Sequence, residues 1–277
     1  MTKFYEILKA IFFGIIEGIT EWLPISSTGH IILADEFVKL KVSEEFMELF
    51  TVVIQLGAIA AVPVLFWHKL NPFSSKKSET ARRRTWSLWG KVCVGVLPAA
   101  ILGVLLDDLF DKHLYNYIVV AVALIAYGIA FIAVERLKSG KSYRIESVYD
   151  ITYKDAITIG AFQMLSLIPG TSRSGSTILG GMLTGVSRVA SAEFSFFMAI
   201  PVMVGASLLK IVKFVYEGSS VSGFELGLLG IAMCVSFTVS LIAIKFLMDF
   251  VKRHSFTPFG IYRIILGAVV IGYFVFR

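Results

Sequence analysis

Charged side chains are scarce in this sequence of 277 residues. Asp, Glu, Lys and Arg make up 17% of the chain, whereas about 25% is usual for a soluble domain, and 56% of the residues are hydrophobic. Disordered chains combine high charge with low hydrophobicity, so the composition excludes that class. It also disfavours an ordinary soluble globule. The alternative is a membrane protein, in which each spanning helix needs about 20 apolar residues.

Cysteine and histidine are also scarce, with two and four residues. Cys93 and Cys234 lie in different apolar runs and form no CxxC motif, which predicts packing thiols instead of a disulfide or a metal site. Four histidines are too few for a histidine-rich metal centre. The sequence therefore predicts neither a disulfide scaffold nor a cysteine–histidine metal centre.

The net charge of +6 comes largely from basic residues in short loops between apolar runs. In a soluble protein such a charge would suggest a nucleic-acid partner. This distribution is instead typical of membrane proteins, whose cytoplasmic loops are basic. We therefore expect membrane lipids around the protein and no nucleic acid.

Several apolar runs are long enough to cross a bilayer as helices. They predict an all-α polytopic membrane protein with six transmembrane helices. The runs are residues 46–68, 88–107, 113–137, 190–216, 224–248 and 257–276.

Two further regions, 4–41 and 153–187, are apolar but interrupted. The first is broken at residues 24–30, Pro-Ile-Ser-Ser-Thr-Gly-His, and the second at residues 169–177, Pro-Gly-Thr-Ser-Arg-Ser-Gly-Ser-Thr. Each piece is short for a span. Open backbone at membrane depth is tolerated only where protein buries it or where it lines a cavity. We therefore expect two re-entrant helical hairpins.

The distribution of charge predicts the orientation of these elements. Basic residues follow the first, third and fifth runs, and acidic residues lie near the opposite ends, so the basic loops are predicted to be cytoplasmic. Region 4–41 then enters and leaves from outside, whereas region 153–187 enters and leaves from inside. The basic residues are Lys69, Lys76, Lys77, Arg82, Arg83, Arg84, Lys91, Arg136, Lys138, Lys141, Arg144, Lys252 and Arg253, and the acidic residues are Asp107, Asp108, Asp111, Glu217 and Glu225.

Each interrupted region is followed by three spans, and an odd number of spans inverts the unit that follows. The chain is therefore predicted to consist of two halves, residues 1–140 and residues 150–277, each with one re-entrant hairpin and three spans, in inverted topology. Glu17 precedes the first break and Gln163 the second, each three residues after a glycine, which supports this repeat. Inverted repeats commonly place a site where the halves meet. The alternative is a chance similarity between two breaks rich in Gly and Ser.

Glu17 and Glu21 are four residues apart within an apolar run, so they share one face of a helix. Carboxylates in such a run are costly and need a cation, a proton or a basic partner. A pair of carboxylates suits Mg²⁺ or Ca²⁺, particularly an ion shared with substrate phosphates. We therefore predict a divalent metal held by Glu17 and Glu21. The alternative is that the apolar helix ends early and water solvates both side chains.

The stretch after these carboxylates combines Ser26, Ser27 and Thr28 with His30. A helix that starts there exposes backbone N–H groups and a positive dipole end, which suit a phosphate group. Ser27 with His30 nearby is the usual arrangement for an activated hydroxyl. The alternative is simple N-capping of the helix that begins near Gly29. Capping accounts for neither His30 nor the upstream carboxylates.

Arg173 lies in the second break among hydroxyl residues and glycines. An arginine inside the membrane is a functional hypothesis by default, and its planar fork suits bidentate phosphate binding. The alternatives are a snorkelling side chain and a structural partner for Glu17 or Glu21. If the breaks face each other, they form one site for phosphoryl transfer, which depends on positioning and charge neutralisation. The residues predicted to bind phosphate are Ser26, Thr28, Gly170, Thr171, Ser172, Ser174 and Thr177.

These segments resemble the undecaprenyl-diphosphate phosphatases of the bacitracin-resistance protein family. Residues 17–30, with two glutamates and the trailing Ser-Ser-Thr-Gly-His, are similar to that family's paired-glutamate motif. Residues 169–177 are similar to its Pro-Gly-x-Ser-Arg-Ser motif. Shorter matches at residues 53–57 and 194–196 extend the resemblance over essentially the whole chain.

The resemblance implies a bacterial inner-membrane enzyme that removes one phosphate from undecaprenyl diphosphate. The product, undecaprenyl phosphate, recycles the lipid carrier for cell-wall synthesis, and the activity confers bacitracin resistance. The site would open to the periplasmic or extracellular side, with the polyprenyl tail among the spans. Ser27 or a water would attack the terminal phosphorus, with His30 as acid or base. The catalytic residues implied are Glu17, Glu21, Ser27, His30 and Arg173.

Two rival functions stand against this prediction. Another class of lipid phosphatase has related Ser-Gly-His and Ser-Arg motifs, but it needs a histidine soon after the arginine, and none follows Arg173 until His254. A polyprenyl-phosphate transporter or flippase would share the repeat, the carboxylates and the arginine. It would not require Ser27 beside His30. The sequence is compatible with a homodimer and leaves the metal, the nucleophile and the oligomeric state open.

Overall fold

The structure, a computed structural model, describes residues 2–114 and 116–276, and for residue 2 and residues 106–113 it describes the backbone alone. All named elements in these residues are helices, and they contain no β-strand apart from one isolated bridge. The all-α prediction is therefore confirmed. Asp107, Asp108 and Asp111 were used to predict the orientation in the membrane, and their side chains lie outside those that the structure describes.

Six helices in the described chain are long and apolar enough to cross a membrane, as the sequence predicts. They make this a multi-pass membrane protein. Many of their large apolar side chains face outward, as Val104, Val212 and Ile242 do with 65–67% of their surface exposed, and these are available to lipid. The helices are α3 (Glu44–Leu65), α5 (Glu79–Leu114, apolar over Glu79–Leu105), α6 (Tyr117–Lys138), α9 (Arg188–Tyr216), α10 (Gly223–Arg253) and α11 (Thr257–Val275).

Helix α5 extends beyond both ends of the apolar run 88–107 that was predicted for it. Its first turns continue through the basic segment, where Arg83 donates to Glu79 at 2.6 Å across one helical turn. Asn116 caps the start of helix α6, because its side chain accepts a hydrogen bond from the N–H of Val119 at 3.0 Å. Hydropathy misses the ends of α5 because helical hydrogen bonding continues past its apolar stretch, and it places the start of α6 too early because the apolar run 113–137 includes the last residues of α5.

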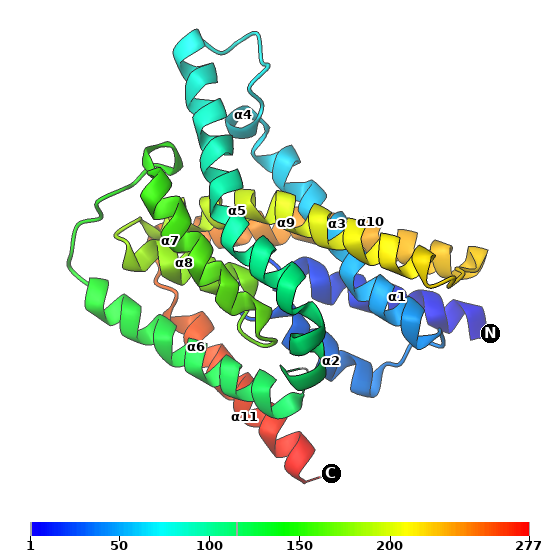
Figure 1. Cartoon of the computed structure of the whole chain (residues 1–277). Helices are drawn as coiled ribbons and strands as arrows, with labels where there is room; N and C mark the ends of the chain where they lie inside the picture. Colours follow the sequence, from blue (N-terminus) through cyan, green and yellow to red (C-terminus); the bar gives the residue numbers. More distant parts are fainter. Residues whose placement is uncertain (1, 115, 277) are drawn as a thin grey trace.

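Four further helices occupy the two interrupted regions (Figure 1), and the first of them, α1, has 19 residues and is as long as the span α11. Helices α1 and α2 flank the first break, and α7 and α8 flank the second. The last three have 11 or 12 residues, well short of the roughly 20 that a span needs. Their bounds are α1 (Thr2–Thr20), α2 (Ser27–Phe37), α7 (Tyr153–Met164) and α8 (Arg173–Leu183), and the connecting segments contain α4 (Trp67–Leu70), η1 (Val148–Asp150) and η2 (Leu165–Leu167).

Each interrupted region packs on a helix that is distant in sequence. Helix α1 packs along α10, and α7 packs along α5, while α6 and α11 lie side by side (Figure 1). Both contacts of the interrupted regions depend on glycine. A Cβ at Gly18 would lie 2.8 Å from the carbonyl oxygen of Ser236, and one at Gly160 would lie 2.1 Å from that of Gly95. This packing carries the two breaks to one place in the interior, where Glu21, just before the first break, is hydrogen-bonded to residues of the second.

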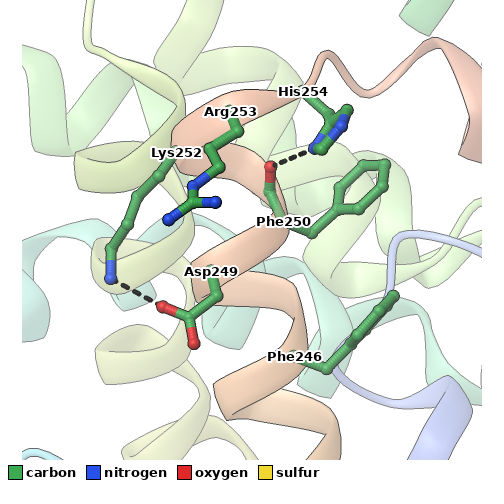
Figure 2. A pocket seen from close by; sticks show the side chains of 6 residues that line it. All are labelled: Phe246, Asp249, Phe250, Lys252, Arg253 and His254. Carbon is green, nitrogen blue, oxygen red and sulfur yellow. Dashed lines mark hydrogen bonds and ion pairs between the residues drawn. The ribbon is translucent and has the colours of Figure 1, made fainter.

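The basic end of α10 forms a surface hollow of about 540 Å³ (Figure 2). Lys252 donates to Asp249 at 2.8 Å, and the ring of His254 lies 3.3 Å from the carbonyl oxygen of Phe250. No residue of either break lines this hollow, so it lies apart from the predicted site. Its lining residues are Phe246, Asp249, Phe250, Lys252, Arg253 and His254.

Candidate active site

Each break contains, directly before the helix that follows it, a serine whose backbone adopts a left-handed conformation. Ser26 has φ 75° and Ser172 has φ 72°, and no other non-glycine residue in the described chain has a positive φ. Such conformations cost about 1–3 kcal/mol and cluster at functional sites. Both serines cap the helix that follows, because the N–H of Gly29 donates to Ser26 Oγ at 3.3 Å and that of Gly175 donates to Ser172 Oγ at 3.1 Å. The two breaks thus share one local geometry. The N-capping that the sequence offered as an alternative role for the serines before α2 is present.

Arg263 of α11 ties the two breaks together and is fully buried. Its Nη1 donates to the carbonyl oxygen of Pro24 at 3.0 Å, in the first break. Its Nη2 donates to the carbonyl oxygens of Gly170 and Thr171 at 2.8 and 2.9 Å, in the second break. One guanidinium group therefore satisfies open backbone from both breaks, which buried carbonyl groups require.

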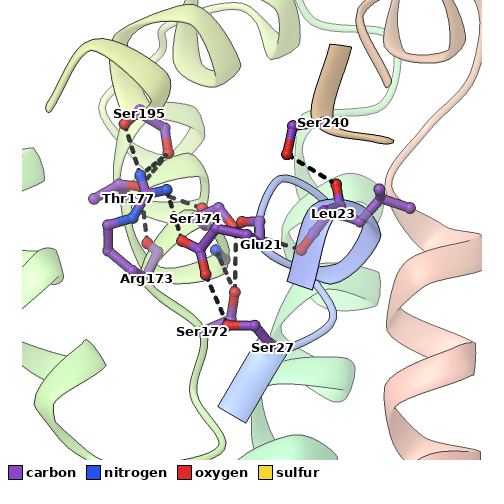
Figure 3. A network of polar contacts seen from close by, with 11 residues as sticks. Glu21, Leu23, Ser27, Ser172, Arg173, Ser174, Thr177, Ser195 and Ser240 are labelled. Carbon is purple, nitrogen blue, oxygen red and sulfur yellow. Dashed lines mark hydrogen bonds and ion pairs between the residues drawn. The ribbon is translucent and has the colours of Figure 1, made fainter. Parts of the chain in front are cut away.

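A carboxylate just before the first break meets an arginine from the second break (Figure 3). Arg173 Nη2 donates to Glu21 Oε1 at 3.0 Å, and the two side chains are 10% and 6% exposed. Ser27 Oγ donates to Glu21 Oε2 at 2.7 Å. Ser174 Oγ donates to the backbone carbonyl of Glu21 at 3.1 Å. The structure therefore brings two predicted site residues, Arg173 and Ser27, to the carboxylate of Glu21 and a third, Ser174, to its backbone.

Helix α9 holds Arg173 on its other side. Arg173 Nη1 donates to the carbonyl oxygen of Ser195 at 2.7 Å, and Thr177 donates to Ser195 Oγ at 2.7 Å (Figure 3). The ring of Trp22, which is fully buried, lies 5.9 Å from the guanidinium carbon of Arg173. A guanidinium group held by a carboxylate, a carbonyl and an aromatic face has one defined orientation. Arg173 is therefore positioned before any substrate arrives.

Glu17 lies one helical turn before Glu21 and is fully buried. Neither of its carboxylate oxygens has a hydrogen-bond partner among the described residues. An unpartnered buried carboxylate is unfavourable, so this position fits a bound cation. The described residues contain no group of three or more His, Cys, Asp or Glu side chains that could hold a metal. An ion held by Glu17 and Glu21 would therefore need oxygen ligands from substrate phosphates or water, as Mg²⁺ commonly takes.

His30 contacts α11 instead of Ser27. Its Nδ1 lies 2.7 Å from the carbonyl oxygen of Ser26, and its Nε2 lies 2.6 Å from Tyr262 Oη. Both ring nitrogens therefore have partners other than Ser27. The expected Ser27–His30 hydrogen bond is therefore not formed in this conformation, and Glu21 is the proton acceptor in contact with Ser27.

The other residues predicted to bind phosphate fall into two groups. Thr28 and Ser172 are half-buried and accessible to a ligand. Thr171 and Thr177 are buried, and each hydroxyl lies within hydrogen-bond distance of backbone carbonyl oxygens nearby, so they shape the second break. Gly170 has φ 93°, and a Cβ there would lie 2.5 Å from a carbonyl oxygen of α6. That glycine is required by the turn and by helix packing.

Sequence reasoning missed three residues that contact this site, Ser195, Tyr262 and Arg263. Arg263 carried a usable signal, because an arginine inside an apolar run is a functional hypothesis by default. The run 257–276 was interpreted as a span only. Ser195 lies in the family-like segment 194–196, but sequence reasoning assigned it no role in the site. Tyr262 carried no comparable signal, since tyrosine is an ordinary residue in spanning helices.

Comparison with known proteins places these features in a family. The sequence model described as Bacitracin resistance protein BacA matches residues 10–269, which include both breaks and the site residues of α9 and α11. An undecaprenyl-diphosphatase of Enterococcus faecalis is 56% identical over 273 residues, which cover 99% of this chain and 99% of the relative. Proteins with the same name from Limosilactobacillus fermentum and Acetivibrio thermocellus are 55% and 56% identical, and each alignment covers 97% of this chain and 98% of the relative. The chain therefore belongs to the Bacitracin resistance protein BacA family.

Proposed function

We propose that this protein hydrolyses undecaprenyl diphosphate to undecaprenyl phosphate and inorganic phosphate. Relatives that match it over nearly their whole length carry the name undecaprenyl-diphosphatase. The structural observation that carries the proposal is the contact between Glu21 and Arg173. It places an arginine, which can bind phosphate, next to the carboxylate that accepts a hydrogen bond from Ser27. The monophosphate product would return the lipid carrier to cell-wall synthesis, and the activity would confer bacitracin resistance.

Arg173 is suited to bind the diphosphate of the substrate. Ser195 fixes one side of its guanidinium group. The Nε–H has no partner among the described residues, so it is left to donate a hydrogen bond to a phosphate oxygen. The N-termini of α2 and α8, capped by Ser26 and Ser172, add backbone N–H groups and positive dipole ends. Together they neutralise charge on the phosphoryl group during transfer.

Glu21 is suited to accept the proton of the nucleophile. Hydrolysis breaks the bond between the terminal phosphorus and the bridging oxygen and forms a bond from phosphorus to the attacking oxygen, whose proton must leave. Ser27 already donates to Glu21 at 2.7 Å, and its attack would form a phosphoserine, which water would then hydrolyse to release inorganic phosphate. A water in the place of Ser27 could instead donate to the same carboxylate and attack the phosphorus directly. His30 contacts α11 and not Ser27, so we assign it an acid or base role separate from the removal of the nucleophile's proton by Glu21.

A divalent ion, Mg²⁺ or Ca²⁺, would be held by Glu17 and Glu21 and would neutralise the diphosphate oxygens. The unpartnered carboxylate of Glu17 supports this assignment. We expect a chelator to abolish phosphate release by the purified protein and added Mg²⁺ or Ca²⁺ to restore it. Full activity after exhaustive chelation would contradict the metal assignment.

We also propose that residues 1–140 and residues 150–277 form inverted repeats with two opposed re-entrant hairpins. The order of elements supports this, since each half has a helix, a break capped by a left-handed serine, a short helix and then three spans. The contacts support it as well. The helix before each break packs on the second span of the other half, while α3 contacts α9 and α6 contacts α11.

The placement in the cell is part of the same proposal. The protein would lie in the bacterial inner membrane with its basic loops in the cytoplasm. The half-buried side of the site, formed by Ser27, Thr28 and His30, would open to the periplasmic or extracellular face, and the polyprenyl tail would lie between spans. A homodimer stays a prediction, to be checked by the mass of the protein in detergent by light scattering.

The decisive experiment measures phosphate released from undecaprenyl diphosphate by purified protein in detergent. We expect the parent protein to release phosphate and Arg173→Ala to lose nearly all activity while it remains folded and monodisperse. Arg136→Ala is the matched control, because this exposed arginine lies at the end of α6 and outside the site. Near-normal turnover in Arg173→Ala would contradict the composite site.

Transport of a polyprenyl phosphate without chemistry is the second candidate function. Broken helices in inverted repeats recur in transporters, and the same site could bind the lipid phosphate. A protein that binds the lipid diphosphate but releases no phosphate with either metal ion would favour transport.

A further inference from the structure

Tyr262 and His30 form a close pair between α11 and α2. Tyr262 Oη lies 2.6 Å from His30 Nε2. The two rings are stacked, with centroids 5.6 Å apart and planes inclined by 2°. Tyr262 comes from a part of the sequence more than 200 residues away, and it carries no role in the proposed chemistry above.

The hydrogen bonds of His30 define which of its nitrogens carries the proton. The carbonyl oxygen of Ser26 can only accept a hydrogen bond, so Nδ1, at 2.7 Å from it, must donate. In the neutral ring Nε2 is then the acceptor, and the hydroxyl of Tyr262 donates to it. One partner on each side therefore fixes both the tautomer and the plane of the imidazole, which is how a histidine is usually prepared for proton transfer.

The backbone that carries Tyr262 is held in place by contacts of its neighbours in α11. Its neighbour Arg263 is fully buried and donates to carbonyl groups of both breaks, which fixes the rotation of α11 about its axis. Gly260 brings α11 against α6, since a Cβ there would lie 2.7 Å from the carbonyl oxygen of Gly128. Tyr262 itself is 43% exposed, so its hydroxyl borders the accessible side of the site where His30 lies.

We propose that Tyr262 is a positioning residue for His30, which keeps Nε2 unprotonated and directed to the accessible side of the site. The expected effect of Tyr262 on kcat rests on the proposed function. The contact between Tyr262 and His30 does not, because it can be observed without turnover. It assigns Tyr262 no contact with the reacting atoms.

The kinetic test is a double-mutant cycle with Tyr262→Phe and His30→Gln. The phenylalanine ring keeps the stack and removes the hydroxyl, and the loss of one such hydrogen bond is expected to lower kcat about tenfold, with KM within about twofold. In the His30→Gln background, Tyr262→Phe should cause no further loss. Tyr216→Phe, on an exposed tyrosine of α9, is the matched control. Equal losses from Tyr262→Phe in both backgrounds, or an unchanged kcat, would overturn the proposal.

The structural test uses NMR of protein labelled with ¹⁵N-histidine, without substrate. The signal of His30 is identified by its disappearance in His30→Gln. We expect a protonated Nδ1 and an unprotonated Nε2 in the parent, and a shift of the Nε2 signal in Tyr262→Phe but not in Tyr216→Phe. An Nε2 signal unaffected by Tyr262→Phe would contradict the contact even if phosphate release is normal. The expected spectra without phosphate release would contradict the proposed function alone.

Discussion

Arg173 is held on two sides of its guanidinium group, by Ser195 and by Glu21. A lysine ammonium group at this position lacks the planar fork and cannot contact both partners while it presents a bidentate face to phosphate. We expect Arg173→Lys to lower phosphate release at least about 100-fold, the size of effect seen when a transition-state donor is removed. The measurement is kcat/KM, with Arg82→Lys in an exposed basic segment as the control. Activity within about threefold of the parent would show that charge alone suffices here.

Ser27 and Glu21 form one hydrogen-bonded pair, so their substitutions test one step. We expect Ser27→Ala to lower kcat by about 100-fold or more, in the range of a lost proton-transfer partner, and Glu21→Gln to lower it at least as much. A phosphoserine trapped by acid quench in the parent would identify Ser27 as the nucleophile. Turnover in Ser27→Ala close to that of the parent would instead identify water as the attacking group.

Helices α5 and α7 approach each other so closely that one methyl group decides their packing. A Cβ at Gly160 would lie 2.1 Å from the carbonyl oxygen of Gly95, so the backbone must shift. Overpacking of this kind costs about 1–3 kcal/mol, and we expect Gly160→Ala to lower the midpoint of thermal unfolding in detergent. Gly227→Ala in α10 is the matched control, because a Cβ there has no atom within 4 Å. Equal melting midpoints for the two variants would contradict the close approach.

The start of α7, outside the six spans, predicts a pH dependence of stability. Burial raises the pKa of Asp155, but hydrogen bonds from Thr152 and Arg144 outweigh burial and hold that pKa below its ordinary value. The carboxylate therefore stabilises the folded protein above about pH 4, and this contribution is lost as the pH falls through the lowered pKa. We expect Asp155→Asn to flatten the acid side of the curve of melting midpoint against pH. Parallel curves for parent and variant would contradict it.

The helices and breaks could be predicted from the sequence where the residues within the segment itself determine them. Apolar length gave all six spans, and Pro, Gly and Ser marked both breaks. The ends of α5 were missed, because its polar turns are stabilised by pairs such as Arg83 with Glu79, which hydropathy ignores. The partner of His30 was missed for a different reason. Tyr262 lies far away in the chain, and only the folded structure brings it to His30.

At the scale of the whole molecule, the two breaks meet because helices from each half pack on the other. Arg173 and Glu21 come from opposite halves, and Arg263 joins both breaks to α11. The sequence predicted one composite site on the condition that the breaks face each other. It could not supply the long-range contacts, because no local pattern encodes which helix α1 or α7 packs against.

Inverted topology makes a prediction about equivalent loops of the two halves. The loop before α5 and the loop before α10 each follow the first span of their half, so inversion puts them on opposite sides of the membrane. Ser75 and Ser220 are exposed in these loops. With Cys93 and Cys234 replaced by alanine, we expect Ser220→Cys to react with a membrane-impermeant maleimide in intact cells. Ser75→Cys should react only after the membrane is permeabilised.

The charge of these two loops predicts the same orientation in the membrane independently of the inverted topology. Basic residues flank Ser75, including Lys76 and Lys77, whereas Glu217 precedes Ser220, and basic loops are retained in the cytoplasm. Labelling of both cysteines from one side would contradict inversion, and the halves would then be parallel. Labelling of Ser75→Cys alone in intact cells would keep the inversion but reverse the orientation, and the site would have to open toward the cytoplasm.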